Sequence, residues 1–129
     1  MKKLFLLSAL LIFACSSDSN SDNRPTNGNS FNPPNWIQGV WMRQDIPDFL
    51  GYEFRADDIC NILGNQASCL KSIIELYQDV PNVQTNVYEE ISNTRYYVVF
   101  SYLTLENTYE FEKISENEIS NGQSIYTKQ

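Results

Sequence analysis

Residues 96–105 read Tyr-Tyr-Val-Val-Phe-Ser-Tyr-Leu-Thr-Leu, the longest run in the chain that is typical of a β-strand. Large apolar side chains occupy both sets of alternating positions, so a strand here would be apolar on both faces. Such a strand either lies at the centre of a sheet covered on both sides or leaves one apolar face exposed for a partner. We favour the covered central strand.

The sequence on both sides of this run alternates with a period of two. In residues 109–112, Tyr109 and Phe111 fall on one face and Glu110 and Glu112 on the other, and residues 52–55 alternate likewise. Further strands are expected at 39–43, 58–63, 69–77, 86–91 and 124–128, with turns at 57–58, 64–65, 81–82, 92–93, 106–107 and 121–122. The sequence therefore predicts one all-β domain over residues 35–129, with about eight short strands in antiparallel meander order.

The segment 70–77 is the ambiguous part of this prediction. Its apolar residues fit a strand, but they also fit one face of a helix, because they recur at helical spacing: Leu70, Ile73, Ile74 and Tyr77.

Two cysteines lie on either side of an expected turn at Gly64-Asn65. If the chain reverses there as a hairpin, Cys60 and Cys69 face each other directly and meet the separation that a disulfide needs. The alternative is two separate buried thiols that act as small apolar residues. We favour a structural disulfide, which stabilises a short loop by about 2–3 kcal/mol in the chain-entropy model.

The first fourteen residues have the layout of a secretory signal peptide. A basic start with Lys2 and Lys3 precedes an apolar run of eleven residues, 4–14, which is too short to span a bilayer as a helix. The run ends in Ile12-Phe13-Ala14-Cys15, which resembles the lipobox of bacterial lipoproteins, although Phe13 is bulkier than the residue usual there. This resemblance implies cleavage before Cys15, acylation of its thiol and a lipid anchor in the membrane. A secreted protein cut elsewhere is the alternative.

Residues 15–34 have the composition of a disordered tether, because Ser, Asp, Asn, Pro and Gly dominate and Phe31 is the only large apolar residue. The stretch 16–19, Ser-Ser-Asp-Ser, resembles the leader that follows the lipidated cysteine in lipoproteins of the Bacteroidota. The expected location is therefore the bacterial cell envelope, as an outer-membrane lipoprotein on the periplasmic or the surface side.

The charge and composition exclude several classes of function. Removing residues 1–14 deletes Lys2 and Lys3 and no acid, so the formal net charge changes from −7 to −9, which argues against nucleic acid as a partner. The chain has no histidine, which removes the commonest general base and zinc ligand. Adjacent acids, Asp57-Asp58 and Glu89-Glu90, point to opposite faces of a strand, and we interpret them as a turn and a solvated strand end. We expect no enzyme activity, no cofactor and no metal site.

Both ends of the expected domain resemble a known family. Residues 34–41, Pro-Asn-Trp-Ile-Gln-Gly-Val-Trp, are similar to the opening of lipocalin-like domains, in which Gly39 and Trp41 match a Gly-x-Trp signature on the first strand. The segments 109–115 and 125–128 are similar to the end of the same family. The resemblance implies a small lipocalin-like β-barrel, and eight short strands leave room for a filled or shallow interior.

The resemblance also implies a function in binding rather than catalysis. The first hypothesis is a module that holds a small apolar ligand at the mouth of the barrel, lined by Trp41, Phe54, Tyr97, Phe111 and Tyr126. The second is a structural or protein-interaction lipoprotein with a solid barrel, which meets an envelope protein through an exposed aromatic face around Tyr88, Tyr96 and Tyr102. The two differ in which face of strand 96–105 is exposed.

Overall fold

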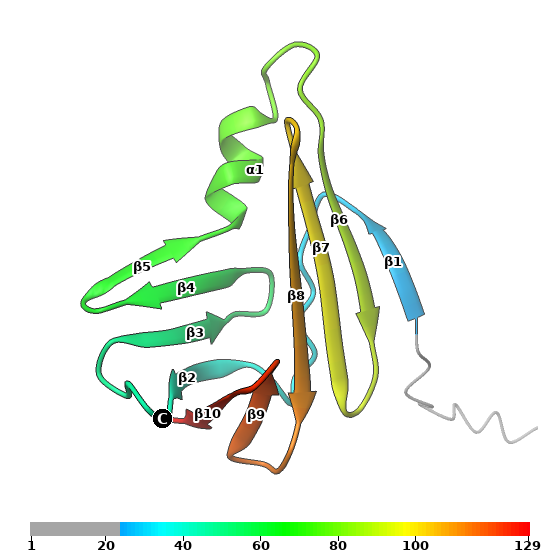
Figure 1. Ribbon diagram of the computed structural model, residues 1–129. Helices are drawn as coiled ribbons and strands as arrows, with labels where there is room; N and C mark the ends of the chain where they lie inside the picture. The colour runs from blue at the N-terminus through cyan, green and yellow to red at the C-terminus, as the bar shows by residue number, and fades with distance from the viewer. Residues whose placement is uncertain (1–23) are drawn as a thin grey trace, which may run out of the picture.

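The computed structural model describes residues 24–129, and in this part of the chain ten strands form one antiparallel sheet that curls into a half-barrel (Figure 1). The elements in chain order are β1 Arg24–Gly28, β2 Gly39–Arg43, β3 Leu50–Phe54, β4 Ile59–Leu63, β5 Gln66–Cys69, α1 Lys71–Tyr77, β6 Thr85–Ile91, β7 Arg95–Tyr102, β8 Leu105–Lys113, β9 Glu118–Asn121 and β10 Ser124–Lys128. The predicted all-β class is confirmed, with ten strands where about eight were expected. The signal peptide, Cys15 and the tether up to residue 23 lie outside the described residues.

The strands follow the order β1-β6-β7-β8-β9-β10-β2-β3-β4-β5, so β1 and β5 are the edges of the sheet. The two edges are not paired with each other in the described part, and the sheet is open between them. Helix α1 follows β5 and lies beside the gap at one end of the molecule (Figure 1). α1 has seven residues, and between residues 24 and 129 no helix has the length and apolar character needed to cross a bilayer.

Part of the N-terminal segment, which we define as residues 24–38, packs into the core on the concave side of the sheet. Phe31 and Ile37 are completely buried in the core, and the Phe31 ring meets the Phe100 ring edge-on at 5.3 Å between centroids. The indole Nε1 of Trp36 donates to the carbonyl of Ser92 at 2.9 Å. The prediction of a disordered tether as far as residue 34 is therefore wrong for residues 24–34, because β1 pairs with β6 and Phe31 enters the core.

A buried carboxylate, Glu89 on β6, holds this segment in place. Its side chain is 1% exposed and accepts four hydrogen bonds: from the Tyr96 hydroxyl at 2.5 Å, the Asn32 backbone amide at 2.7 Å, Asn32 Nδ2 at 3.1 Å and the Thr26 hydroxyl at 3.2 Å. Two of the donor residues lie in the N-terminal segment and the third lies on β7. The interpretation of Glu89 as part of a solvated strand end is therefore wrong. A buried charge is tolerated when hydrogen bonds replace its hydration.

The ambiguous segment forms helix α1 rather than a strand over residues 71–77. Its apolar stripe turns Leu70 and Ile74 into the core, as helical spacing requires. No side chain of the helix itself caps the N-terminus. Asp58, the residue before β4, accepts a hydrogen bond from the Lys71 amide at 2.8 Å and so satisfies a free helical N–H group. The expected strand 69–77 is therefore wrong beyond Cys69.

The strand that dominates the sequence, β7, is apolar on both faces but ends earlier than expected. Its inner face, with Tyr96, Val98 and Phe100, is completely buried, while Tyr97 and Val99 on the outer face stay partly exposed. The chain then reverses at 103–104, where Leu103 has a left-handed φ of 53°, and the turn expected at 106–107 lies inside β8. Leucine rarely takes this conformation, so the sequence gives no turn signal there.

The predicted disulfide is confirmed. Cys60 on β4 and Cys69 on β5 are directly opposite in the antiparallel register, and their sulfur atoms are bonded. The bond fixes β5, a sheet edge, to β4 just before the chain enters α1.

The burial of Tyr96 and the partial burial of Tyr52 predict a loss of stability at alkaline pH. Burial, followed by the nearby Glu89 charge, raises the pKa of Tyr96 well above 10, and burial beside Tyr126 raises the pKa of Tyr52 likewise. Above about pH 10 both groups ionise in the unfolded chain but stay protonated in the folded one, so the folded state binds more protons. We expect the free energy of unfolding to fall as pH rises, by about 1.4 kcal/mol per pH unit for each tyrosine.

Urea unfolding between pH 9 and 11 measures this slope. Tyr96→Phe and Tyr52→Phe should each make the slope shallower, whatever they do to stability at pH 8. Equal slopes in the wild type and both variants would contradict the assignment.

Candidate functional site

The five residues expected to line a ligand site do not all lie together. The structure brings four of them together inside the half-barrel, where Trp41 and Phe111 are completely buried and Phe54 and Tyr126 are 2% and 7% exposed. The rings of Phe54, Phe111 and Tyr126 contact one another directly or through Tyr52: Phe54 meets Phe111 at 4.8 Å, and Tyr52 meets Phe111 at 5.0 Å and Tyr126 at 5.2 Å. These side chains occupy the space that a ligand would need, so the interior is a packed aromatic core.

Trp41 on β2 is held by two contacts with other parts of the chain. Its indole Nε1 donates to the carbonyl of Ile37 at 2.6 Å, and the ammonium of Lys128 lies 5.3 Å from the centroid of its ring. A cation over an indole face is a stabilising contact. Trp41 therefore acts as an anchor between the N-terminal segment and β10.

The fifth residue, Tyr97, lies on the convex face, away from the other four. There its ring meets Tyr88 edge-on at 6.5 Å and lies under the guanidinium of Arg95 at 4.8 Å. The aromatic face expected around Tyr88, Tyr96 and Tyr102 does not form, because Tyr96 is in the core and Tyr102 stacks between Phe100 and Tyr77 at 5.1 and 6.1 Å.

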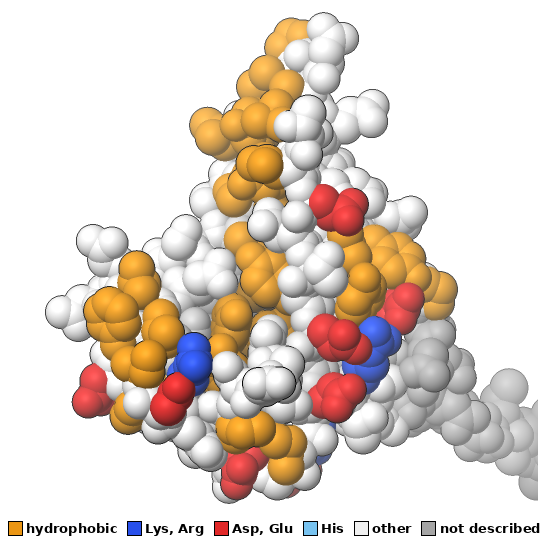
Figure 2. Space-filling model, viewed as in Figure 1, with side chains coloured by type: hydrophobic (Ala, Val, Ile, Leu, Met, Phe, Trp, Pro, Cys, Tyr) orange, Lys and Arg blue, Asp and Glu red, His pale blue; other side chains and the backbone are white. Residues whose placement is uncertain are grey.

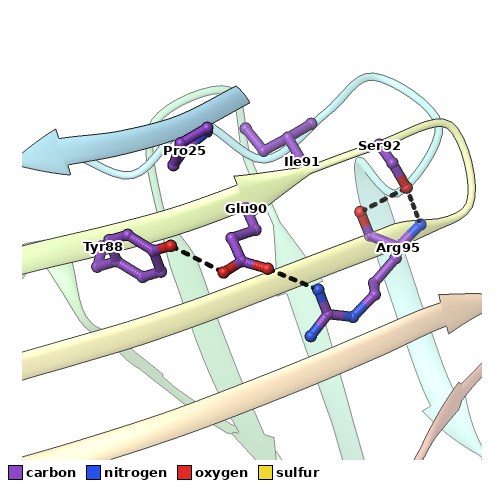
Figure 3. A pocket seen from close by; sticks show the side chains of 6 residues that line it. All are labelled: Pro25, Tyr88, Glu90, Ile91, Ser92 and Arg95. Atoms are coloured by element: carbon purple, nitrogen blue, oxygen red, sulfur yellow. Dashed lines mark hydrogen bonds and ion pairs between the residues drawn. The ribbon is translucent and has the colours of Figure 1, made fainter. Parts of the chain in front are cut away.

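A hollow of about 270 Å³ lies beside Tyr88 at the end of β6 where the chain turns into β7 (Figure 3). It is lined by Pro25, Tyr88, Glu90, Ile91, Ser92 and Arg95. The Tyr88 hydroxyl donates to Glu90 Oε1 at 2.8 Å, and Arg95 binds Glu90 Oε2 at 2.8 Å and Glu110 Oε1 at 2.7 Å (Figure 3 draws the first two).

The charges of this hollow are satisfied internally. Hydrogen bonds from Tyr88 and Arg95 lower the pKa of Glu90, and both carboxylates raise the pKa of Arg95. One cation shared by two anions leaves no excess positive charge for an anionic ligand. We interpret the hollow as a surface ion network, which contributes little to stability or binding.

A larger hollow, of about 610 Å³, lies at the opposite end of β6, and we call it the end pocket. Three parts of the chain form it: the end of β1 and the residues after it, the end of α1, and the connection into β6. It is lined by Asn27, Gly28, Asn29, Tyr77, Gln78, Val83, Gln84, Thr85 and Asn86. None of these side chains is ionised at neutral pH, and five of them are amides.

Exposed apolar side chains gather at the same end of the molecule. Figure 2 shows hydrophobic side chains over α1 and the connection after it, where Leu76 is 67% and Val80 is 41% exposed. The β7–β8 turn adds Leu103 and Leu105, which are more than half exposed, and the stacking of Tyr77 on Tyr102 brings α1 beside the end of β7.

The remaining cluster of chemically active side chains, Asp58 with Cys60 and Cys69, is structural. The two sulfurs are consumed by the disulfide and cannot ligate a metal, and Asp58 accepts the amides of Ile59 and Lys71 at 2.8 Å each. Its neighbour Asp57 is exposed and pairs with the Lys71 ammonium.

The residues of the end pocket are not predicted by the sequence analysis. One sequence pattern marks them: two amide residues stand at alternate positions twice in the chain. The first pair is Asn27 and Asn29, and the second is Gln84 and Asn86. The two places are more than fifty residues apart, and only the pairing of β1 with β6 brings them together.

Comparisons of the chain with protein-family models, with curated proteins and with solved structures found no match.

The packed interior predicts very different costs for two of the expected ligand residues. Phe111→Ala should lower the free energy of unfolding by about 3–5 kcal/mol, because it leaves a cavity in the aromatic core. Tyr97→Ala, which removes the same kind of ring from the convex face, should cost about 1 kcal/mol. Urea unfolding of both variants measures the difference. Similar, small costs would show that Phe111 lines an open cavity instead.

Proposed function

We propose that this chain is an exported, lipid-anchored lipoprotein of the bacterial envelope whose domain is a non-catalytic binding module. Its binding surface is the end pocket, and its interior serves only as a core. The single observation that carries this proposal is the position of the end pocket, which lies at the opposite end of β6 from the point where the anchored N-terminal segment joins the sheet.

The register of β1 supports this arrangement. Arg24 pairs with Ile91 at the far end of β6 and Gly28 pairs with Val87, so the chain enters the sheet at Ile91 and runs toward the end pocket. β6 has seven residues, which corresponds to about 20 Å. A domain held at the Ile91 end thus presents the end pocket away from its point of attachment.

The length of chain before the domain allows this display. In the proposal Cys15 carries the lipid, and the nine residue steps from Cys15 to Arg24 reach at most about 30 Å. The net charge of −9 after cleavage keeps the domain itself from binding an anionic membrane surface and disfavours nucleic acid as a partner. The lipid then provides the only attachment, on the periplasmic or the surface side of the outer membrane.

The strand order supports a relation to lipocalin-like barrels. Consecutive strands from β6 to β10 and from β2 to β5 are neighbours, which is the order of an up-and-down barrel. In this proposal the domain is a lipocalin-like barrel that stays open between its edges, with the N-terminal segment in the place of an interior ligand. A small apolar ligand inside the barrel then has no room, and binding takes place on the outside.

A protein partner is the second candidate function, and the exposed Leu76, Val80, Leu103 and Leu105 favour it. These side chains border the same end of the molecule as the end pocket, and an envelope protein seated there would cover them. Both candidates share the lipid anchor and the packed interior. They differ in what binds at the end of the molecule that carries the end pocket.

The anchor is tested by Cys15→Ser, with Ser16→Ala as the matched control. In cells fed an alkyne-labelled fatty acid, the wild type and Ser16→Ala should carry the label and sediment with the outer membrane. Cys15→Ser should lose the label and be released from that fraction. An unlabelled wild type, or a Cys15→Ser variant that still sediments with the outer membrane, would contradict the proposal.

A further inference from the structure

The end pocket is unusually rich in amide side chains. Asn and Gln make up 21 of the 129 residues in the chain, but five of the nine residues that line this pocket. In the described part of the chain, the side chains of Asn27, Gln78, Gln84 and Asn86 make no hydrogen bond to another protein group. Their donors and acceptors are therefore available to a ligand.

The walls of the pocket are held by contacts that do not involve these four amides. The Asn29 amide lies against Thr85 and joins the chain after β1 to the start of β6. The connection after α1 is a succession of turns, in which the amide of Val80 donates to the carbonyl of Tyr77 at 3.1 Å and that of Val83 to Val80 at 3.3 Å. Asn82 takes a left-handed φ of 62° in this connection. The pocket is thus formed before any ligand binds.

The polarity of the lining selects a class of ligand. A pocket without ionised groups offers no counter-charge to a phosphate, a carboxylate or an ammonium group, whose desolvation would go uncompensated. An amide both donates and accepts hydrogen bonds, as a hydroxyl group does, so neighbouring amides match neighbouring hydroxyls. Tyr77 adds an aromatic ring with an apolar body and a polar tip.

We propose that the end pocket binds a neutral carbohydrate, a short uncharged oligosaccharide held by the side-chain amides and packed on Tyr77. This inference rests on the proposed function and names the ligand class of the same site. The volume of about 610 Å³ lies in the range of pockets that hold small molecules. A peptide is the competing ligand, because its backbone also donates and accepts hydrogen bonds.

The test is calorimetric titration of the full, exported and lipidated chain in a detergent without a sugar headgroup. The probes are maltotetraose, cellotetraose, xylotetraose and chitotetraose, with tetragalacturonate as the anionic counterpart and a capped tetraserine peptide as the competitor. The variants are Gln84→Ala and Asn86→Ala in the pocket, with Gln66→Ala as the matched control, because Gln66 is an exposed amide on β5 outside the pocket.

We expect at least one neutral tetrasaccharide to bind, tetragalacturonate and the peptide to give no heat of binding, and each pocket variant to weaken binding at least tenfold. Gln66→Ala should leave the affinity unchanged. Binding of the peptide alone, binding that prefers tetragalacturonate, binding indifferent to Gln84 and Asn86, or no binding by any tetrasaccharide would overturn the inference.

A second measurement separates this inference from the proposed function. A ligand that binds the folded chain raises its midpoint of thermal unfolding, and a soluble extract of the envelope supplies ligands of every class. If no saccharide binds but the extract raises the midpoint, and Asn86→Trp abolishes that rise by filling the pocket, the carbohydrate inference fails and the binding module stands. If the extract has no effect either, both fail.

Discussion

The buried carboxylate of Glu89 is the interaction on which the arrangement of the domain depends. It lies inside the sheet on β6 and accepts hydrogen bonds from Thr26, Asn32 and Tyr96, so it joins the N-terminal segment to two central strands. A buried carboxylate without such partners is strongly unfavourable, because it loses its hydration without replacement. The native position of the segment therefore satisfies the carboxylate, and the carboxylate in turn keeps the segment in the concave side.

The proposed function depends on the position in which Glu89 holds the N-terminal segment. Phe31 and Ile37 are completely buried in the core, together with the aromatic side chains of the sheet. The same segment joins the sheet at the Ile91 end of β6. A lipid anchor that precedes this segment, as proposed, leaves the Thr85 end of β6 free. That end combines an uncharged amide-lined pocket with exposed leucines, and the proposed binding rests on these two features.

The sequence predicts the parts of this fold that local pattern determines. A long run of β-type residues marks β7 and alternation marks β8, and the spacing of Cys60 and Cys69 around a Gly-Asn turn predicts their register and their bond. The pattern fails where long-range contacts decide: Phe31 lies in a polar stretch that reads as a tether, and Leu103 turns the chain without Gly or Asn. The end pocket is missed for the same reason, since the pairing of distant strands assembles it.

Native-state hydrogen exchange of Glu89→Leu tests the role of this carboxylate most directly, with Glu112→Leu, a change of the same kind at an exposed position on β8, as the control. Leucine keeps the bulk but accepts no hydrogen bond, so four donors lose their partner. We expect the amides of β1 to exchange at least tenfold faster in Glu89→Leu, while those of β3 and β4 change much less and Glu112→Leu resembles the wild type. Unchanged protection of β1, or an equal loss across all strands, would contradict the claim that Glu89 holds the N-terminal segment in the half-barrel.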